Sequence, residues 1–161
     1  AESAPVHLNR LVTALAEVQN ANDNPDSPRV EVVGASGDAY EVPGLEGRLG
    51  QVFRNLIGNA VSFSPPGGII TVQLERVGRR VQVSVEDRGP GIPPGKEQAI
   101  FERFYSERPE GEKFGTHSGL GLSISKQIVD AHQGELYAEN ARDAATGKVL
   151  GARFIVRLPA M

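Results

Sequence analysis

A carboxylate at the end of an apolar strand is the first residue in this chain that could do chemistry. Valines alternate along residues 80–86, and by the same period of two Asp87 falls on their face, toward the core. Burying a carboxylate without a partner is costly, so Asp87 either binds a hydrogen-bond donor at the mouth of a cavity or leaves the strand through an Asx-type turn. Gly89 and Gly91, on either side of a proline, favour the first interpretation, because glycine lets the backbone approach a ligand closely.

Two asparagines four residues apart form a second candidate. Asn55 and Asn59 share one side of a predicted helix, opposite its apolar stripe, although asparagine is unfavourable inside a helix. The pair is either part of a solvated polar face or a functional site. In the functional interpretation, the carboxamide oxygens offer hard ligands to a Mg²⁺ ion that is held mostly by phosphate.

A glycine-rich turn before a helix is the third candidate. Gly119 and Gly121 precede a predicted helix, whose unpaired N–H groups and positive dipole end suit a phosphate. The turn is not a Rossmann fingerprint, because Ile124 stands where the third glycine is required, and Gly95-Lys96 does not complete a P-loop. Taken alone, it is equally compatible with a plain connection between loop and helix.

The elements that must position these residues follow from hydrophobic periodicity. We expect helices at 6–19, 45–63 and 121–132, and strands at 29–33, 39–43, 69–77, 80–86, 135–140 and 148–158. The glycines in 34–37 predict a hairpin between the first two strands. Residues 89–118 have no regular period apart from a short helical patch at 98–105, which indicates a functional lid. The order predicts an α+β fold, an antiparallel or mixed sheet with helices on one face.

Composition limits the function classes. The 161 residues predict one domain, 1–161, and the absence of cysteine excludes disulfides, thiolate metal sites and a cysteine nucleophile. A net charge of -3 argues against nucleic acid as the partner, and no apolar run is long enough for a membrane-inserted segment. The 19 glycines and 11 prolines gather at transitions between periodic segments, which favours specific turns over low complexity.

The order of these motifs resembles the sensor histidine kinases, in the class that also holds Hsp90, gyrase B and MutL ATPases. The segments 55–60, 87–92, 101–105 and 117–124 are similar to the family's N, G1, F and G2 boxes. The segments 106–110 and 117–125 further resemble the ChvG/BvrS envelope-sensing kinases of alphaproteobacteria. The resemblance implies the Bergerat-type two-layer α/β sandwich with an ATP lid at about 92–118.

The resemblance also implies roles for single residues, with ATP and Mg²⁺ as cofactors. Asp87 would bind the adenine amino group, Asn59 the Mg²⁺ and Asn55 the phosphates, while Phe63 would stack beside adenine. Hydrolytic relatives carry a glutamate where Asn55 stands, and an amide cannot act as a base, which favours a kinase over an ATPase. The remaining residues expected to bind nucleotide are Ser62, Gly89, Gly91, Ile92, His117, Ser118, Gly119, Leu120, Gly121 and Leu122.

Two expected cations are missing. Ser62 and Ser106 stand where the family often has lysine and arginine, so Arg103 or Arg108 would supply the catalytic charge, unless both are solvated lid charges. The loss of these cations is also the support for a nonenzymatic pseudokinase module. A serine kinase of the anti-sigma type is the other alternative to a histidine kinase.

The phosphoacceptor block His-Glu-x-x-Arg-x-Pro does not occur in the chain. The resemblance therefore implies a catalytic module, monomeric by itself, from a homodimeric bacterial inner-membrane kinase with this domain in the cytoplasm. Its phosphoryl group would pass to a histidine on a separate helical domain and then to a response regulator. His132, at a helix end before a glycine, is expected to be a capping or core histidine.

Overall fold

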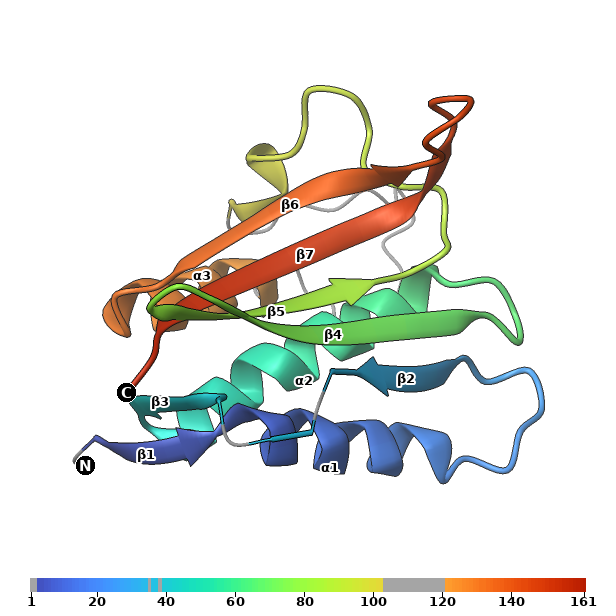
Figure 1. Cartoon of the computed structure of the whole chain (residues 1–161). Helices are drawn as coiled ribbons and strands as arrows, with labels where there is room; N and C mark the ends of the chain where they lie inside the picture. The colour runs from blue at the N-terminus through green and yellow to red at the C-terminus, as the bar shows by residue number, and fades with distance from the viewer. Residues whose placement is uncertain (1–2, 35, 38, 103–120) are drawn as a thin grey trace.

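The computed structural model describes residues 3–34, 36–37, 39–102 and 121–161. Three α-helices, one short 3-10 helix and seven strands occur in these ranges (Figure 1). In chain order they are β1 (Ala4–His7), α1 (Leu8–Asn20), β2 (Arg29–Val33), β3 (Glu41–Gly44), α2 (Glu46–Phe63), β4 (Ile69–Val77), β5 (Arg80–Glu86), η1 (Ala99–Phe101), α3 (Gly121–Ala131), β6 (Glu135–Arg142) and β7 (Val149–Pro159).

The main sheet has five strands in the order β2-β4-β5-β7-β6. The β2–β4 pair is parallel and the other three pairs are antiparallel, so the sheet is mixed and mostly antiparallel. Strands β4 and β5 occupy the residues that alternation predicts. The α+β sandwich expected from the order of elements is confirmed.

The predicted hairpin at 34–37 is wrong. β2 pairs with β4, whereas β3 pairs antiparallel with β1 in a separate two-stranded sheet. Gly34 and Gly37 do have positive φ angles of 82° and 101°, which glycine adopts readily. These glycines do not determine which strand a segment pairs with. β1 was not predicted as a strand, and its last two residues, Val6 and His7, were included in the predicted first helix.

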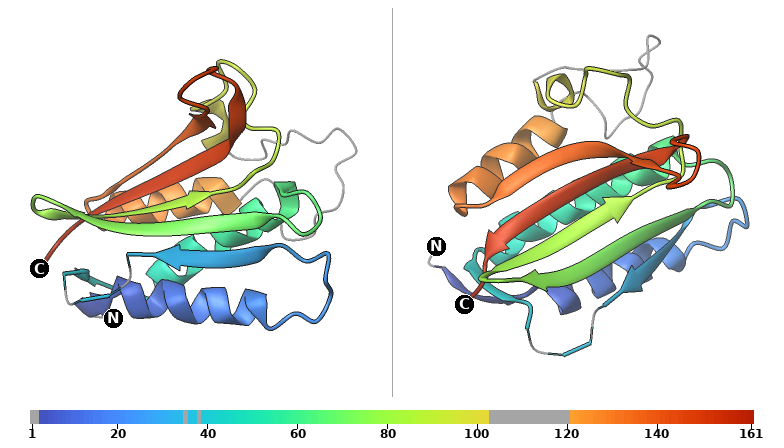
Figure 2. Two further views of the ribbon diagram at one scale, coloured as in Figure 1. Left: turned by 45° about the vertical axis from the view of Figure 1, so that its right-hand side comes forward. Right: turned by 45° about the horizontal axis from the view of Figure 1, so that its top comes forward.

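The core lies between one face of the main sheet and the helices. The two views of Figure 2 show α1, α2 and α3 together on this face. Alternate residues of the central strands face the helices and are at most 6% exposed, and Phe53 and Leu56 of α2 are fully buried. This layer includes Phe53, Leu56, Ile70, Val72, Val83, Phe154 and Val156.

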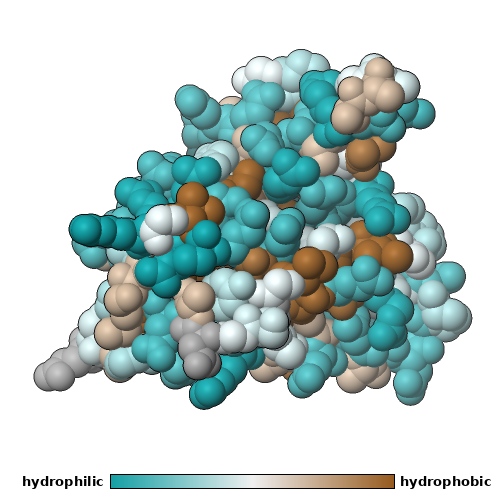
Figure 3. Space-filling view, in the orientation of Figure 1, coloured by the Kyte–Doolittle hydropathy of each residue, from teal (hydrophilic) through white to brown (hydrophobic). Residues whose placement is uncertain are grey.

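The outer face of the sheet is mostly hydrophilic, with apolar residues in small separate groups (Figure 3). Cross-strand ion pairs cover part of it, since Arg153 contacts Glu86 at 3.0 Å and Glu139 at 2.8 Å. No helix in the described part of the chain is both long enough and apolar enough to cross a bilayer.

The first part of the expected lid is attached to the core. Within the helical patch predicted at 98–105, the structure has the 3-10 helix η1, and residues 103–105 lie outside the described ranges. Phe101 is 9% exposed and packs edge-on against Phe154 of β7, with ring centroids 6.1 Å apart. This contact holds the segment after β5 against the sheet, and Lys126 of α3 lies over the Phe101 ring with its Nζ 6.0 Å from the centroid.

Candidate functional site

Asp87 follows β5 and points into the protein, as the alternation of that strand predicts. The residue is 2% exposed. Its Oδ1 accepts hydrogen bonds from the N–H of Gly89 at 2.8 Å and of Ala152 at 3.1 Å. The first bond is the Asx-type turn that was one of the two interpretations of the sequence, and the second gives the carboxylate a backbone donor on β7. Oδ2 makes no hydrogen bond within the described residues.

Burial has an electrostatic consequence at this position. Desolvation raises the pKa of the Asp87 carboxyl above its ordinary value of 3.8, and the nearby charge of Glu86 adds to this. The hydrogen bonds from Gly89 and Ala152 oppose the rise but are the smaller effect. A carboxylate held in this way accepts hydrogen bonds more readily than one in water, because its environment does not compete for the second oxygen.

Two glycines allow the chain to pass close to Asp87. A Cβ on Gly89 would collide with the carbonyl of Phe63, and a Cβ on Gly151 would collide with the carbonyl of Asp87 itself. The absence of these side chains brings the end of α2, the end of β5 and β7 into direct contact. Gly151 was not singled out from the sequence, because its constraint comes from a residue 64 positions away.

Asn55, Asn59 and Phe63 form one row along α2. Residues four apart lie on the same face of a helix, so the row runs about 12 Å from Asn55 to the loop after β5. Asn59 is only 9% exposed, which corrects the expectation that the asparagines lie opposite the apolar stripe. The carboxamide of Asn59 makes no hydrogen bond within the described residues. Ser62 lies on the same last turn and is half-buried.

Asn55 joins α2 to the first turn of α3. Its Nδ2 donates to the carbonyl oxygen of Gly121 at 3.3 Å and to Oγ of Ser125 at 3.2 Å. Ser125 is fully buried, and Leu122 packs against the core. The helix that follows the glycine-rich turn is therefore held beside the asparagine row. A solvated polar face does not account for Asn55.

His132 connects the same two helices at their other ends. Its Nε2 accepts a hydrogen bond from the N–H of Leu45 at 3.1 Å, just before α2 begins, and its Nδ1 donates to the Ile128 carbonyl at 2.8 Å. These bonds assign the proton to Nδ1 and satisfy a backbone N–H before α2. The expected role as a capping histidine applies to both helices, because Nδ1 donates to a carbonyl in the last turn of α3 and Nε2 accepts from the N–H just before α2.

The loop after Asp87 has an anchor that sequence reasoning missed. Gly91 has φ 87°, as expected for a glycine with a structural role, and Ile92 is buried with only 7% exposed. The side chain of Ile92 thus belongs to the core, and its backbone contacts Asn140 of β6. The alternation that located Asp87 also puts Asn140 on the inner face, with Leu136 and Ala138, so the signal was present.

Several predicted residues lie outside the described ranges. Asn55 contacts Gly121 at the start of α3, where Leu122 packs against the core. Asp87 and Gly89 lie next to Phe63 at the end of α2, and Asn59 and Ser62 lie on α2 between these two places. Gly91 and Ile92 lie against Asn140 of β6. The predicted residues without a described position are Arg103, Arg108, His117, Ser118, Gly119 and Leu120.

Comparisons with known proteins agree with this arrangement. The sensor protein ChvG of Rhizobium meliloti is 50% identical over 139 residues, which cover 86% of this chain and 22% of that protein. ChvG of Agrobacterium fabrum is 43% identical over 99% of this chain and 28% of its own length. The chain thus spans about a quarter of the length of these relatives.

Among solved structures, the catalytic domain of histidine kinase ThkA superposes with a TM-score of 0.81 at 28% identity, covering 99% of this chain and 96% of that one. Residues 44–161 match the family described as histidine kinase-, DNA gyrase B- and HSP90-like ATPases. These residues include the asparagine row, the buried carboxylate and the start of α3. The chain therefore belongs to the histidine kinase-, DNA gyrase B- and HSP90-like ATPase family, and its similarity to sensor kinases extends to the ChvG type.

Proposed function

We propose that this chain is the ATP-binding catalytic domain of a two-component sensor histidine kinase. A histidine nitrogen on a separate dimerisation domain attacks the γ-phosphorus of ATP, the bond to the ADP oxygen breaks, and the phosphoryl group later passes to a response regulator. The observation that carries the proposal is the amide row of α2, which leads from the start of α3 to a buried carboxylate.

One end of the site, the base end, consists of Asp87, Gly89, Phe63 and Ala152. In the proposal the free oxygen Oδ2 of Asp87 accepts a hydrogen bond from the adenine amino group, while Phe63 packs beside the ring. Oδ1 is already occupied by two backbone N–H groups, so the carboxylate keeps its orientation when adenine binds. Because Gly89 has no side chain, the end of α2 with Phe63 can lie directly against the loop that follows Asp87.

The other end, the phosphate end, consists of Asn55, Asn59 and the start of α3 at Gly121. The N–H groups of residues 119–122 bind the triphosphate, helped by the positive end of the α3 dipole. Asn55 acts here as a positioning residue, because its amide holds α3 beside α2. An amide at this place cannot activate water, so the site favours transfer to a histidine over hydrolysis.

The residues present fit a Mg²⁺ ion that arrives with ATP. The Asn59 carboxamide is nearly buried, has no hydrogen-bond partner within the described residues, and offers an oxygen of the hard type that Mg²⁺ prefers. A single amide is compatible with this ion, which takes most of its ligands from phosphate and water. When bound, Mg²⁺ would neutralise charge on the triphosphate. His117 and Ser118 are proposed to border the phosphates.

The family often has a lysine at the position of the half-buried Ser62, and serine carries no charge. Another residue must therefore supply the cation near the γ-phosphate. We assign this charge to Arg103 or Arg108, the two arginines that follow η1. Either guanidinium would stabilise negative charge on the transferred group.

Two solved relatives support the ligands and partners of the proposal. ShkA, whose structure has a TM-score of 0.78 to this chain at 28% identity, was solved in complex with AMPPNP, and ThkA was solved in complex with the response regulator TrrA. By analogy we propose ATP and a response regulator as partners here. We further propose a homodimeric, membrane-anchored parent with this domain in the cytoplasm, and a monomeric state for the 161-residue chain.

Phosphotransfer with labelled ATP tests the proposal. The chain is incubated with Mg-ATP and dimerisation domains of ChvG-type kinases, and the acid stability of the product is measured. We expect acid-labile phosphohistidine. Acid-stable phosphoserine would indicate the serine kinase alternative, and a lack of AMPPNP binding at millimolar concentration in calorimetry would indicate a nonenzymatic module.

A further inference from the structure

Asn140 forms a reciprocal pair of hydrogen bonds with the backbone of Ile92. Its Oδ1 accepts from the Ile92 N–H at 2.7 Å, and its Nδ2 donates to the Ile92 carbonyl at 3.0 Å. A carboxamide has the same donor and acceptor as a peptide group, so the side chain takes the place that a neighbouring strand would occupy. Both polar backbone groups of the half-buried segment at Ile92 are thereby satisfied.

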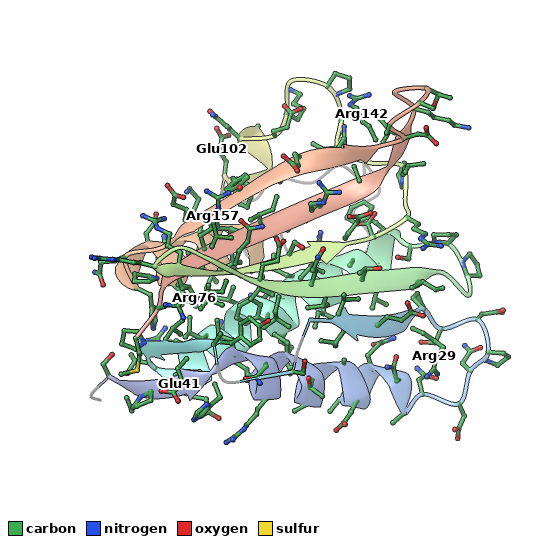
Figure 4. All side chains as sticks on the ribbon, viewed as in Figure 1. Arg29, Glu41, Arg76, Glu102, Arg142 and Arg157 are labelled. Atoms are coloured by element: carbon green, nitrogen blue, oxygen red, sulfur yellow. The ribbon has the colours of Figure 1, made fainter. Side chains whose placement is uncertain are left out.

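The geometry of β6 directs Asn140 to this place. Alternation puts it on the inner face of the sheet, and the pairing with β7 shifts register immediately afterwards, between Ala141 and Arg142. Such irregularities at strand ends reorient the side chains beside them. In Figure 4, Arg142 marks this end of β6, next to the segment that leads from β5 to η1.

The same end of the sheet holds the base end of the site. Asn140 is opposite Ala152 of β7, and Ala152 exchanges hydrogen bonds with Asp87, both as donor to Oδ1 and as acceptor from the Asp87 N–H at 3.0 Å. One row across three strands therefore joins Asn140 to Asp87. The loop 88–92 starts at one end of this row and is fixed at the other.

Gly91 is enclosed at this fixed point. A Cβ there would lie 2.8 Å from Oδ1 of Asn140 and 2.6 Å from Cγ1 of Val149, and its φ of 87° suits glycine. The loop is thus held by two hydrogen bonds and by close contact with the β6–β7 hairpin. If Asn140 is lost, ordering of the loop must accompany ligand binding, which weakens binding.

We propose that Asn140 is a positioning residue that holds loop 88–92 in the nucleotide-binding conformation before ATP arrives. The inference rests on the proposed function, because it assigns adenine to the adjoining base end. Asn140 touches the loop and not the ligand, so its role is to lower the free-energy cost of ordering that loop.

The chain offers a matched control. Asn20 of α1 makes the same reciprocal pair with Val30 of β2, with both hydrogen bonds at 2.8 Å. α1 and β2 contribute no residue to the base or phosphate end. Asn20→Ala and Asn140→Ala therefore remove equivalent bonds, one pair outside the site and one beside it.

Two measurements on the 161-residue chain test the proposal. Amide hydrogen exchange over residues 88–98, without nucleotide, is expected to become about tenfold faster in N140A and to stay unchanged in N20A. Calorimetry with Mg-AMPPNP is expected to give about tenfold weaker affinity for N140A and wild-type affinity for N20A. Equal affinity in the two variants, or unchanged exchange in N140A, overturns the positioning role.

A third variant keeps the test valid if N140A folds poorly. In Asn140→Asp, only the protonated carboxyl can both donate to and accept from the Ile92 backbone. The affinity of this variant for Mg-AMPPNP, divided by that of the wild type, should therefore rise as pH falls. A ratio that does not change with pH overturns the role. Hydrogen exchange needs no ligand, so it distinguishes the two proposals. Faster exchange in N140A together with no binding by wild type overturns the proposed function and, with it, the role of Asn140 toward nucleotide.

Discussion

The two ends of the candidate site are built in different ways. At the base end, Asp87 is held by backbone N–H groups at 2.8 and 3.1 Å and is enclosed by close contacts at Gly89 and Gly151. At the phosphate end, Asn55 joins two helices through hydrogen bonds that are longer, at 3.2 and 3.3 Å. Strand pairing fixes the first end, whereas side-chain contacts fix the second.

In the proposed function, the base end would recognise the nucleotide and the phosphate end would serve phosphoryl transfer. In the proposed function, a preorganised base end would bind adenine without a cost for ordering the loop, which would favour affinity and selectivity. A phosphate end joined by longer side-chain hydrogen bonds would allow α3 to adjust against α2, as the proposed transfer to a second domain would require. The comparison predicts large effects of substitution at the base end and smaller ones at the phosphate end.

The largest effect is expected for Asp87→Asn. The amide oxygen can still accept from Gly89 and Ala152, but its NH₂ group then faces the adenine amino group, donor against donor. An unpaired buried donor costs about 1–3 kcal/mol on each side, so affinity for Mg-AMPPNP should fall about a hundredfold or more while the fold is kept. Calorimetry and circular dichroism measure the two quantities. Affinity within threefold of wild type would remove Asp87 from the site.

Gly151→Ala tests the base end from the side of β7, and we expect a smaller loss of nucleotide affinity than for Asp87→Asn. The new Cβ meets the Asp87 carbonyl, so β7 and the end of β5 must separate, at a cost in unfolding free energy of about 1–3 kcal/mol. Chemical denaturation measures this value, and affinity for AMPPNP should fall with it. Gly47→Ala is the control, because a Cβ at this exposed helix position meets no atom within 4 Å. Equal stability of the two variants would contradict a tightly built base end.

The raised pKa of Asp87 gives a prediction on stability against pH. The folded state holds the proton more strongly than the unfolded state, whose carboxyl has a pKa near 3.8, so the wild type loses stability as pH rises through the folded pKa. D87N has no such ionisation. Its free energy of unfolding should therefore exceed that of the wild type at pH 7, and the difference should disappear below about pH 4. Denaturation curves across this range measure the difference; one that grows on acidification would give the pKa shift the opposite sign.

The sequence predicted the helices, the strands and their buried faces better than it predicted which strands pair and which distant residues are in contact. Alternation predicted the positions of β4 and β5 and the inward direction of Asp87, because these features depend only on the period within one segment. The pairing of β2 was wrong and Gly151 was missed, since each is determined by a residue far along the chain. Asn140 is intermediate: its inward face follows from alternation, but its contact with Ile92, 48 residues away, requires the fold.

The same limit applies to the asparagine row. Helical spacing put Asn55 and Asn59 on one face, but the position of α3 relative to α2 decides that this face is covered. A helix face that packs against a neighbour through polar side chains has the same sequence pattern as a solvated one. The motif order, through family resemblance, favoured a functional face, and the structure shows that Asn55 contacts α3.

The smallest expected effect concerns the contact between the two helices. A double-mutant cycle of Asn55→Ala and Ser125→Ala isolates the Asn55–Ser125 hydrogen bond, which at 3.2 Å between neutral groups should contribute a coupling energy of about 0.5–1 kcal/mol. Unfolding free energies of the four proteins measure it, and AMPPNP affinities measured in parallel should change less for either single variant than for D87N. A coupling above about 2 kcal/mol would mean that the phosphate end is as firmly fixed as the base end. Adjustment of α3 against α2 would then be excluded, and any movement during phosphotransfer would have to lie in the lid.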